Sequence, residues 1–138
     1  MMKIQNVFFI LLLALVVCCD NQSNDVSTNF TSSKLVGSWQ LSETYISPGG
    51  VTEWVDVENG FIYIFDSDAT FKKTVSDGAL QESGRYRTEE RELFLEFEFE
   101  GEQTTIGYCL ELTDGKITLS PSFPAICIEG CYYRFKRK

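Results

Sequence analysis

Histidine is absent from this chain of 138 residues. Its absence excludes the Ser-His-Asp triad, the Cys-His nucleophile and the His-ligated zinc ion, which are the commonest routes to hydrolysis. Any catalysis would have to come from carboxylates, tyrosine or lysine, as it does in glycosidases. We therefore predict that the protein is not an enzyme and that it carries no cofactor and no metal.

Basic residues are scarce as well, because 12 Lys and Arg stand against 20 Asp and Glu and the formal net charge is −8. An acidic surface repels phosphate backbones, and the only basic cluster is the final RFKRK, so we expect no nucleic-acid partner. Apolar residues, in contrast, are plentiful. Hydrophobic residues make up 43% of the chain and aromatic residues 14%, which is enough for the core of one domain.

One long apolar run lies near the N-terminus. Lys3 is followed by VFFILLLALVV at 7–17 and then by two cysteines. A helix from Val7 to Cys19 would measure roughly 20 Å, which is too short for a hydrocarbon layer of about 30 Å. This layout predicts a signal peptide over residues 1–18 rather than a permanent membrane span.

The end of this run resembles the lipobox of bacterial lipoproteins, in which a small residue precedes the cysteine that receives the lipid. Cys18 is closer in size to that small residue than the β-branched Val17 is, so Cys19 is the favoured attachment site and Cys18 the alternative. Two buried or disulfide-bonded cysteines are the remaining interpretation. The resemblance implies an exported protein that is anchored in the cell envelope, at the outer membrane, by several acyl chains, because one chain binds weakly.

The residues after the cysteines form a polar segment, DNQSNDVSTNFTSS at 20–33. Its composition predicts a flexible tether with a root-mean-square span of about 20 Å. The chain therefore divides into a signal peptide at 1–18, a tether at 19–33 and a domain at 34–138.

From Leu35 onward the apolar residues alternate with polar ones, and no segment has the pattern of an amphipathic helix. The alternation is clearest in ELFLEFEFE, and turn signals such as Asp-Gly separate the runs. Eight strands are predicted, at 35–42, 60–65, 70–75, 80–87, 92–100, 104–112, 116–120 and 131–137.

Eight short antiparallel strands in succession predict an all-β fold, a small up-and-down barrel. Closure of the barrel would remove the exposed sheet edges that an aromatic chain needs to avoid. A two-sheet sandwich built from the same strands is the alternative.

Three stretches resemble the lipocalin-like domain found in envelope lipoproteins of Bacteroidetes-type bacteria. They are LVGSW at 35–39, ENGFIYIFDSDATFKKT at 58–74 and CIEGCYYRFKRK at 127–138. In lipocalins an arginine near the last strand packs across the tryptophan of the first strand and closes the barrel base. The resemblance therefore implies this role for Arg134, together with Gly37 and Trp39. The alternative is an ordinary core tryptophan and a solvated arginine.

The strand pattern places two rows of apolar side chains inside the barrel. These are Phe61, Tyr63 and Phe65 in one strand and Leu93, Leu95, Phe97 and Phe99 in another. They form either a solid core or the lining of a ligand cavity. Two functions follow: a membrane-anchored protein that binds a small hydrophobic ligand, or a solid-core structural or protein-interaction module whose partner the sequence does not name. A filled interior excludes the first, and an exposed apolar patch on one rim favours the second.

Three cysteines remain in the domain, which we expect to lie in an oxidising compartment. Cys127 and Cys131 flank IEG, where Gly130 permits a tight turn, and we predict a disulfide between them. Pairing of Cys109 with either of these cysteines is also compatible with the sequence.

Overall fold

The structure is a computed structural model that describes residues 32–125 and 127–138. The predicted signal peptide, the lipid-attachment residue Cys19 and its alternative Cys18 lie outside the described residues. Of the predicted tether, only Ser32 and Ser33 are described, and both belong to a short 3-10 helix, η1 (Ser32–Lys34). In the described part of the chain no helix is long and apolar enough to cross a membrane.

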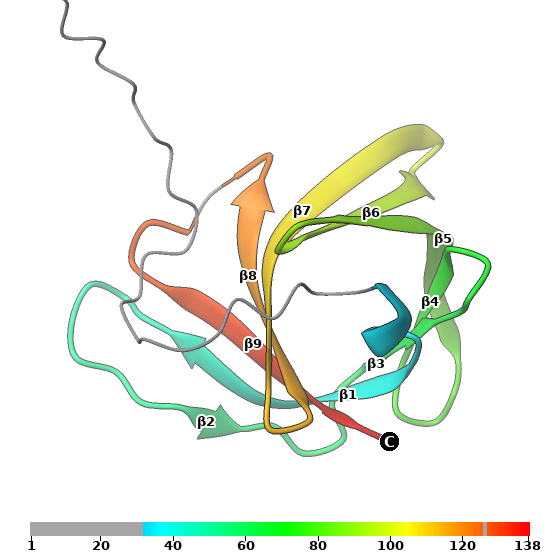
Figure 1. Cartoon of the computed structure of the whole chain (residues 1–138). Helices are drawn as coiled ribbons and strands as arrows, with labels where there is room; N and C mark the ends of the chain where they lie inside the picture. The colour runs from blue at the N-terminus through cyan, green and yellow to red at the C-terminus, as the bar shows by residue number, and fades with distance from the viewer. Residues whose placement is uncertain (1–31, 126) are drawn as a thin grey trace, which may run out of the picture.

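Nine β-strands follow η1, arranged around one core (Figure 1). They are β1 (Gly37–Ile46), β2 (Val55–Asp56), β3 (Ile62–Phe65), β4 (Thr70–Thr74), β5 (Leu80–Glu89), β6 (Glu92–Phe99), β7 (Glu102–Thr113), β8 (Lys116–Phe123) and β9 (Cys131–Arg137).

Eight of these strands, β1 and β3 to β9, form a closed antiparallel barrel, as predicted. Each strand pairs with the next in the chain, and β9 returns to pair with β1, so the sandwich alternative is wrong. In Figure 1, β1 and β9 run side by side at the lower left, and β4 and β5 form the wall on the right. The described ranges contain no α-helix.

Two-residue turns join the hairpins where the sequence carries its turn signals. At Glu100-Gly101 and at Asp114-Gly115 both residues have positive φ angles, between 51° and 84°. Such turns match the right-handed twist of the flanking strands, and glycine adopts a positive φ without steric cost. The Asp-Gly pair therefore marks a hairpin, as expected.

Several strand bounds differ from the prediction, since β1 reaches Ile46 rather than residue 42, and two further differences have a physical reason. β2 was not predicted, because it has only two residues and pairs with Glu43 and Thr44, beyond the part of β1 that pairs with β3. β8 continues past residue 120 through Pro121, which lies beside a bulge in its pairing with β7. Proline lacks an N–H group, and a bulge tolerates it because the ladder of hydrogen bonds is already interrupted there.

The barrel has two different ends. At one end, called the closed end, η1 leads into the fully buried Leu35, and the Trp39 indole N–H donates a 2.7 Å hydrogen bond to the Leu35 carbonyl oxygen. The opposite end, called the mouth, carries the connections β1–β2, β4–β5, β6–β7 and β8–β9. The core residues cluster toward the closed end.

Candidate functional site: the mouth of the barrel

The closed end is sealed by Arg137 and not by the predicted Arg134. The guanidinium carbon of Arg137 lies 4.4 Å from the centroid of the Trp39 ring. The same guanidinium donates hydrogen bonds of 3.1 Å to the Val36 carbonyl oxygen and 2.9 Å to that of Lys34. A Cβ atom on Gly37 would lie 2.7 Å from Arg137, so the glycine leaves room for this contact.

Arg134 lies on the outer wall because of strand register. Trp39 pairs with Arg137, but a bulge between Leu41 and Glu43 shifts the pairing of β1 and β9, and Arg134 pairs with Glu43. Its guanidinium carbon lies 3.7 Å from the Trp54 ring centroid. The resemblance implied the right kind of contact and the wrong arginine.

The inward-facing side chains of β6 become steadily more exposed toward the mouth. Leu93, Leu95 and Phe97 are buried, as predicted for the interior, but Phe99 is 54% exposed. The prediction that Phe99 lies in the interior is therefore wrong, because β6 ends at this residue and its side chain reaches the rim.

Two further strands show the same gradient. In β7, Leu110 is buried, whereas Tyr108 and Ile106 are partly exposed. In β9, Phe135 is buried, whereas Tyr133 is partly exposed. The register pairs Tyr108 with Leu93 and Ile106 with Leu95, which places both on the inner face. We call the part of the barrel near the mouth, where these inward-facing side chains are only partly buried, the open half.

Aromatic rings fill the closed half. Tyr63 contacts the rings of Phe65 and Phe71, with centroids 5.7 and 6.2 Å apart, and Phe61 at 5.2 Å. Phe71 in turn contacts Phe97 at 6.1 Å. Phe61 itself is only partly buried and packs against this core, so it lies between the filled half and the open half.

An ion pair faces the open half from inside the barrel. Lys73 follows the buried Phe71 by two residues, and Glu82 is its register partner in β5. The Lys73 Nζ atom lies 3.4 Å from a carboxylate oxygen of Glu82, and the two side chains are 22% and 26% exposed. The ammonium also lies 4.7 Å from the centroid of the Phe61 ring. A charged pair in this position is largely removed from water, which costs free energy that a solid core would avoid.

Two tyrosine hydroxyls lie near this pair. Burial raises the pKa of Tyr63 well above its ordinary value, and the nearby Tyr108 and Glu82 raise it further. The pKa of Tyr108 is also raised, chiefly by burial, although its hydrogen bond with Tyr63 lowers it. Both hydroxyls are therefore close to each other and to the Glu82 carboxylate, and both keep their protons at neutral pH.

All the exposed large hydrophobic residues of the described chain lie at or next to the mouth. They are Ile46, Val51, Val55, Leu80, Phe99, Phe123, Ile128 and Tyr132. Each stands at a strand end or in a connection that belongs to this end of the barrel. We call this set the apolar rim.

The predicted disulfide between Cys127 and Cys131 is present at the mouth, with the two Cα atoms 5.7 Å apart. This pairing excludes both alternatives that joined Cys109 to one of these cysteines. The bridged loop contacts the β1–β2 connection, because the Ser47 N–H donates a 3.0 Å hydrogen bond to the Gly130 carbonyl oxygen.

An aromatic cluster on the outer wall holds the β1–β2 connection. Trp54 lies 5.6 Å from Tyr45 and 6.4 Å from Tyr132, measured between ring centroids. Arg134 covers Trp54 and also bonds Glu43 at 3.2 Å. Burial acts to raise the pKa of Glu43, but the hydrogen bonds and charges of Arg134 and Lys116 outweigh it, so the pKa lies below its ordinary value.

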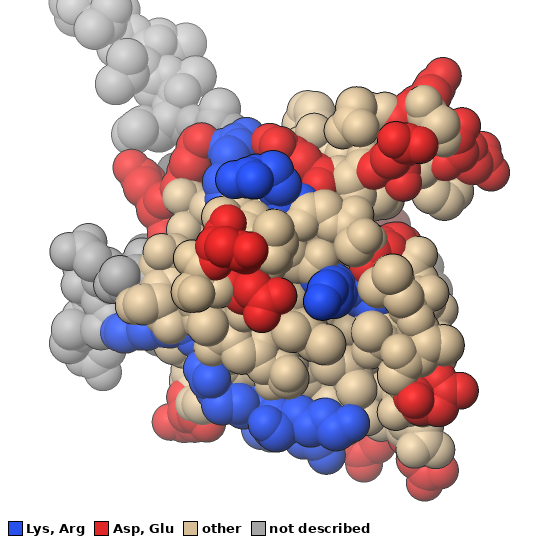
Figure 2. Space-filling view, turned by 90° about the vertical axis from the view of Figure 1, so that its right-hand side faces the viewer, with Lys and Arg blue, Asp and Glu red and all other residues tan. Residues whose placement is uncertain are grey.

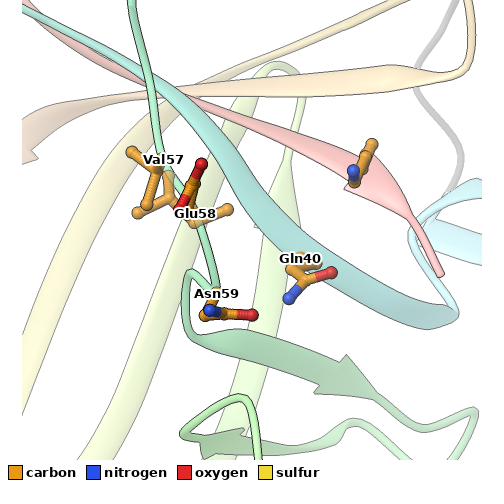
Figure 3. A pocket seen from close by; sticks show the side chains of 6 residues that line it. Gln40, Val57, Glu58 and Asn59 are labelled. Carbon is orange, nitrogen blue, oxygen red and sulfur yellow. The ribbon is translucent and has the colours of Figure 1, made fainter.

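A hollow lies on the outer wall of the barrel, beside the β1 bulge (Figure 3). Its volume is about 390 Å³, and its lining is Gln40, Leu41, Val57, Glu58, Asn59 and Lys136. Figure 3 shows Glu58 and Asn59 on the segment that faces β1. Several of these side chains are exposed, so the hollow is shallow and offers little desolvation to a ligand.

Acidic side chains gather at the β6–β7 turn. Glu98, Glu100 and Glu102 are all exposed there, and Figure 2 shows acidic side chains grouped on a lobe that projects at the upper right. Within residues 32–125 and 127–138 no group of three or more Cys, Asp or Glu residues is arranged to hold a metal ion.

Sequence reasoning missed Lys73 and Glu82. Part of the signal was available, because alternation places Lys73 on the same face of the strand as the apolar Phe71. The stretch TFKKTV was interpreted only as a strand, and which of its two lysines faces inward depends on the register with β3.

A closed antiparallel barrel whose strands pair in chain order defines the class of small up-and-down β-barrels. The chain belongs to the lipocalin-like domain family, whose sequence model matches residues 35–119.

Two solved structures share this fold. One is an uncharacterized protein from Bacteroides eggerthii, with 21% sequence identity and a TM-score of 0.51, covering 75% of this chain and 98% of the other. The second is a lipocalin-like protein from Bacteroides uniformis, with 20% identity and a TM-score of 0.51, covering 76% and 99%. At these identities the likeness extends to the fold alone. No curated protein matches the chain.

Proposed function

We propose that this protein is an envelope lipoprotein whose barrel binds one small molecule with an apolar body, entering through the mouth. The observation that carries the proposal is the gradient of exposure along the inner face, from the fully buried Leu93 to the exposed Phe99. A solid-core module would bury the inward-facing Ile106, Tyr108 and Tyr133 as fully as Leu93, whereas all three are only partly buried. The Lys73–Glu82 ion pair inside the mouth also supports ligand binding, because a buried ion pair adds no stability to a packed core.

Native mass spectrometry tests ligand binding. The full chain, purified in detergent from the membranes that hold it, is incubated with a lipid extract of a Bacteroidetes-type envelope. A defined extra mass that is lost on unfolding supports a binding protein and gives the ligand's mass. An unchanged mass at saturating extract contradicts the proposal.

The membrane anchor is the second part of the proposal, and it rests on the lipobox-like sequence before Cys19. Incorporation of radiolabelled palmitate into the full chain is the measurement. Cys19→Ala is expected to abolish incorporation, and Cys18→Ala, the matched control, is expected to retain it. The reverse result would assign the lipid to Cys18. An absence of label in the natural chain and in both variants would contradict the anchor.

A protein-interaction module is a second candidate, favoured by the apolar rim. Exposed apolar side chains gathered at one end of a molecule mark interaction surfaces. An unchanged mass in the experiment above, together with a crosslinked partner that is lost on replacing Ile128 with serine, would favour this function instead.

A further inference from the structure

The polar groups inside the mouth restrict the kind of molecule that can bind there. Between Arg137 at the closed end and the exposed Glu102 at the rim, the inward-facing positions of the described strands carry two charges, Lys73 and Glu82. The charges are of opposite sign and lie 3.4 Å apart. This part of the barrel therefore has no net charge.

A charged head group would be poorly accommodated beside this pair. An anion attracted to Lys73 would also lie against Glu82, and a cation attracted to Glu82 would lie against Lys73. At such short separations the attraction and the repulsion are comparable, and a charged ligand would still lose its hydration on entry. The pair itself would have to separate before either charge could gain a new partner.

An uncharged head group meets the opposite situation. A hydroxyl or an amide both donates and accepts hydrogen bonds. It can accept from the Lys73 ammonium, donate to Glu82, and exchange a hydrogen bond with the nearby Tyr108 hydroxyl. The ion pair stays intact, and every polar group keeps a partner.

The order of the side chains along the barrel sets the direction of entry. The polar groups lie inside the mouth, and the apolar rim lies outside them, with Phe99 and Leu80 at the ends of the neighbouring strands. A ligand that enters head first places its polar group against the ion pair and its apolar body against the rim.

Resting on the proposed function, we infer that the ligand is an uncharged amphiphile, with a hydroxyl or amide head group held between Lys73, Glu82 and Tyr108 and an apolar body at the rim. The head group and not the apolar body then decides which amphiphiles are accepted, because many apolar bodies fit an open rim.

Competition between three probes with the same C12 chain tests this inference. The full chain is incubated in detergent with equal amounts of 1-monolauroylglycerol, laurate and dodecylamine, and native mass spectrometry ranks the adducts by mass. The uncharged glycerol ester is expected to exceed each charged probe by at least about fivefold, because charged groups pay more to leave water.

Charge variants make the test specific. Glu82→Gln leaves Lys73 unopposed and is expected to move the preference to laurate, and Lys73→Gln is expected to move it to dodecylamine. The double variant Lys73→Gln with Glu82→Gln restores the preference for the glycerol ester. Lys72→Gln is the matched control, because this exposed lysine faces outward in the same strand and its loss should leave the ranking unchanged.

The outcomes separate the two proposals. Laurate or dodecylamine bound best by the natural chain, or single variants that bind without any change of ranking, would overturn the head-group inference and leave ligand binding intact. An adduct from the envelope extract, with no adduct from any of the three probes, would also overturn the head-group inference and leave ligand binding intact. No adduct from the extract or from the probes would overturn both. Circular dichroism of each variant confirms that the barrel is folded.

Discussion

At the scale of single residues, Arg137 secures the closed end through one guanidinium that stacks on Trp39 and bonds two carbonyl oxygens. We expect Arg137→Ala to lower the free energy of unfolding by about 1–3 kcal/mol, because the stacking and both hydrogen bonds are lost. Urea denaturation measures this change in the free energy of unfolding. Arg137→Lys is expected to recover only part of the lost stability, because an ammonium lacks the planar, forked shape of a guanidinium.

Arg85→Ala is the matched control for this experiment. Arg85 is exposed on β5, which pairs with neither β1 nor β9, and its loss should change the free energy of unfolding by less than about 0.5 kcal/mol. Equal losses at Arg85 and Arg137 would mean that the base contact contributes no specific stability.

Tyr63 gives a prediction about alkaline pH. Burial above all, and then Tyr108 and Glu82, hold its pKa well above the ordinary value near 10. Between that value and the higher folded pKa the unfolded chain loses the proton while the folded chain keeps it. The stability that this tyrosine contributes is therefore present below about pH 10 and is lost as pH rises further.

The replacement Tyr63→Phe isolates this contribution. Urea denaturation at about pH 8 and about pH 11 should show a smaller loss of stability between the two values in the variant than in the natural chain. The difference between the two proteins at about pH 8 gives the cost of the lost hydrogen bond with Tyr108, which is then subtracted from the difference at about pH 11. Parallel losses in the two proteins would contradict a raised pKa.

At the scale of elements, the pairing of β5 with β6 depends on Gly84. A Cβ atom there would lie 2.0 Å from the Glu96 carbonyl oxygen and 2.9 Å from the Phe97 Cβ atom. Gly84→Ala is therefore expected to cost about 2 kcal/mol or more, because the strands must move apart. Gly50→Ala, where a Cβ atom meets nothing within 4 Å, should be nearly neutral. Thermal unfolding compares the two, and similar melting temperatures would show that the strands absorb the extra atom.

Strand order was predictable because alternation and turn residues are local signals. The strand of ELFLEFEFE and the Asp114-Gly115 turn could be located from a few neighbouring residues. The features that the sequence did not reveal depend on register between strands distant in the chain. The register of β1 with β9 decides that Arg137 and not Arg134 meets Trp39, and the only local hint is that Arg137 shares a strand face with the buried Phe135.

The candidate site was predicted only in part, for the same reason. The apolar interior at Tyr63 and Leu93 follows from alternation, and the structure confirms that both are buried. The depth of Phe99 and the inward direction of Lys73 depend on where each strand ends and on how it pairs with its neighbours.

At the scale of the whole molecule, the apolar rim gives one end of the barrel a different surface from the other. Replacing Val51 and Ile128 by serine is expected to reduce the fluorescence of the apolar dye ANS bound to the folded protein. Because both side chains are almost fully exposed, the free energy of unfolding should change by less than about 0.5 kcal/mol. Arg91→Ser, at the closed end, is the control that should leave dye binding unchanged. Unaltered fluorescence in the Val51 and Ile128 variant would place the dye elsewhere.

The two ends of the barrel also differ in how the chain reaches them. The described chain enters at η1, next to the closed end, and the mouth lies at the opposite end (Figure 1). An anchor attached before residue 32, as we propose, would therefore connect to the domain at its closed end.

The pairing of β1 with β9 has a consequence for the time at which the barrel forms. Trp39 pairs with Arg137, so the wall cannot close until nearly a hundred further residues have followed the first strand out of the ribosome. A nascent chain that lacks β9 retains an open sheet with two unpaired edges and an incomplete core. We expect such a chain to stay loosely folded during synthesis, which is compatible with the proposed export.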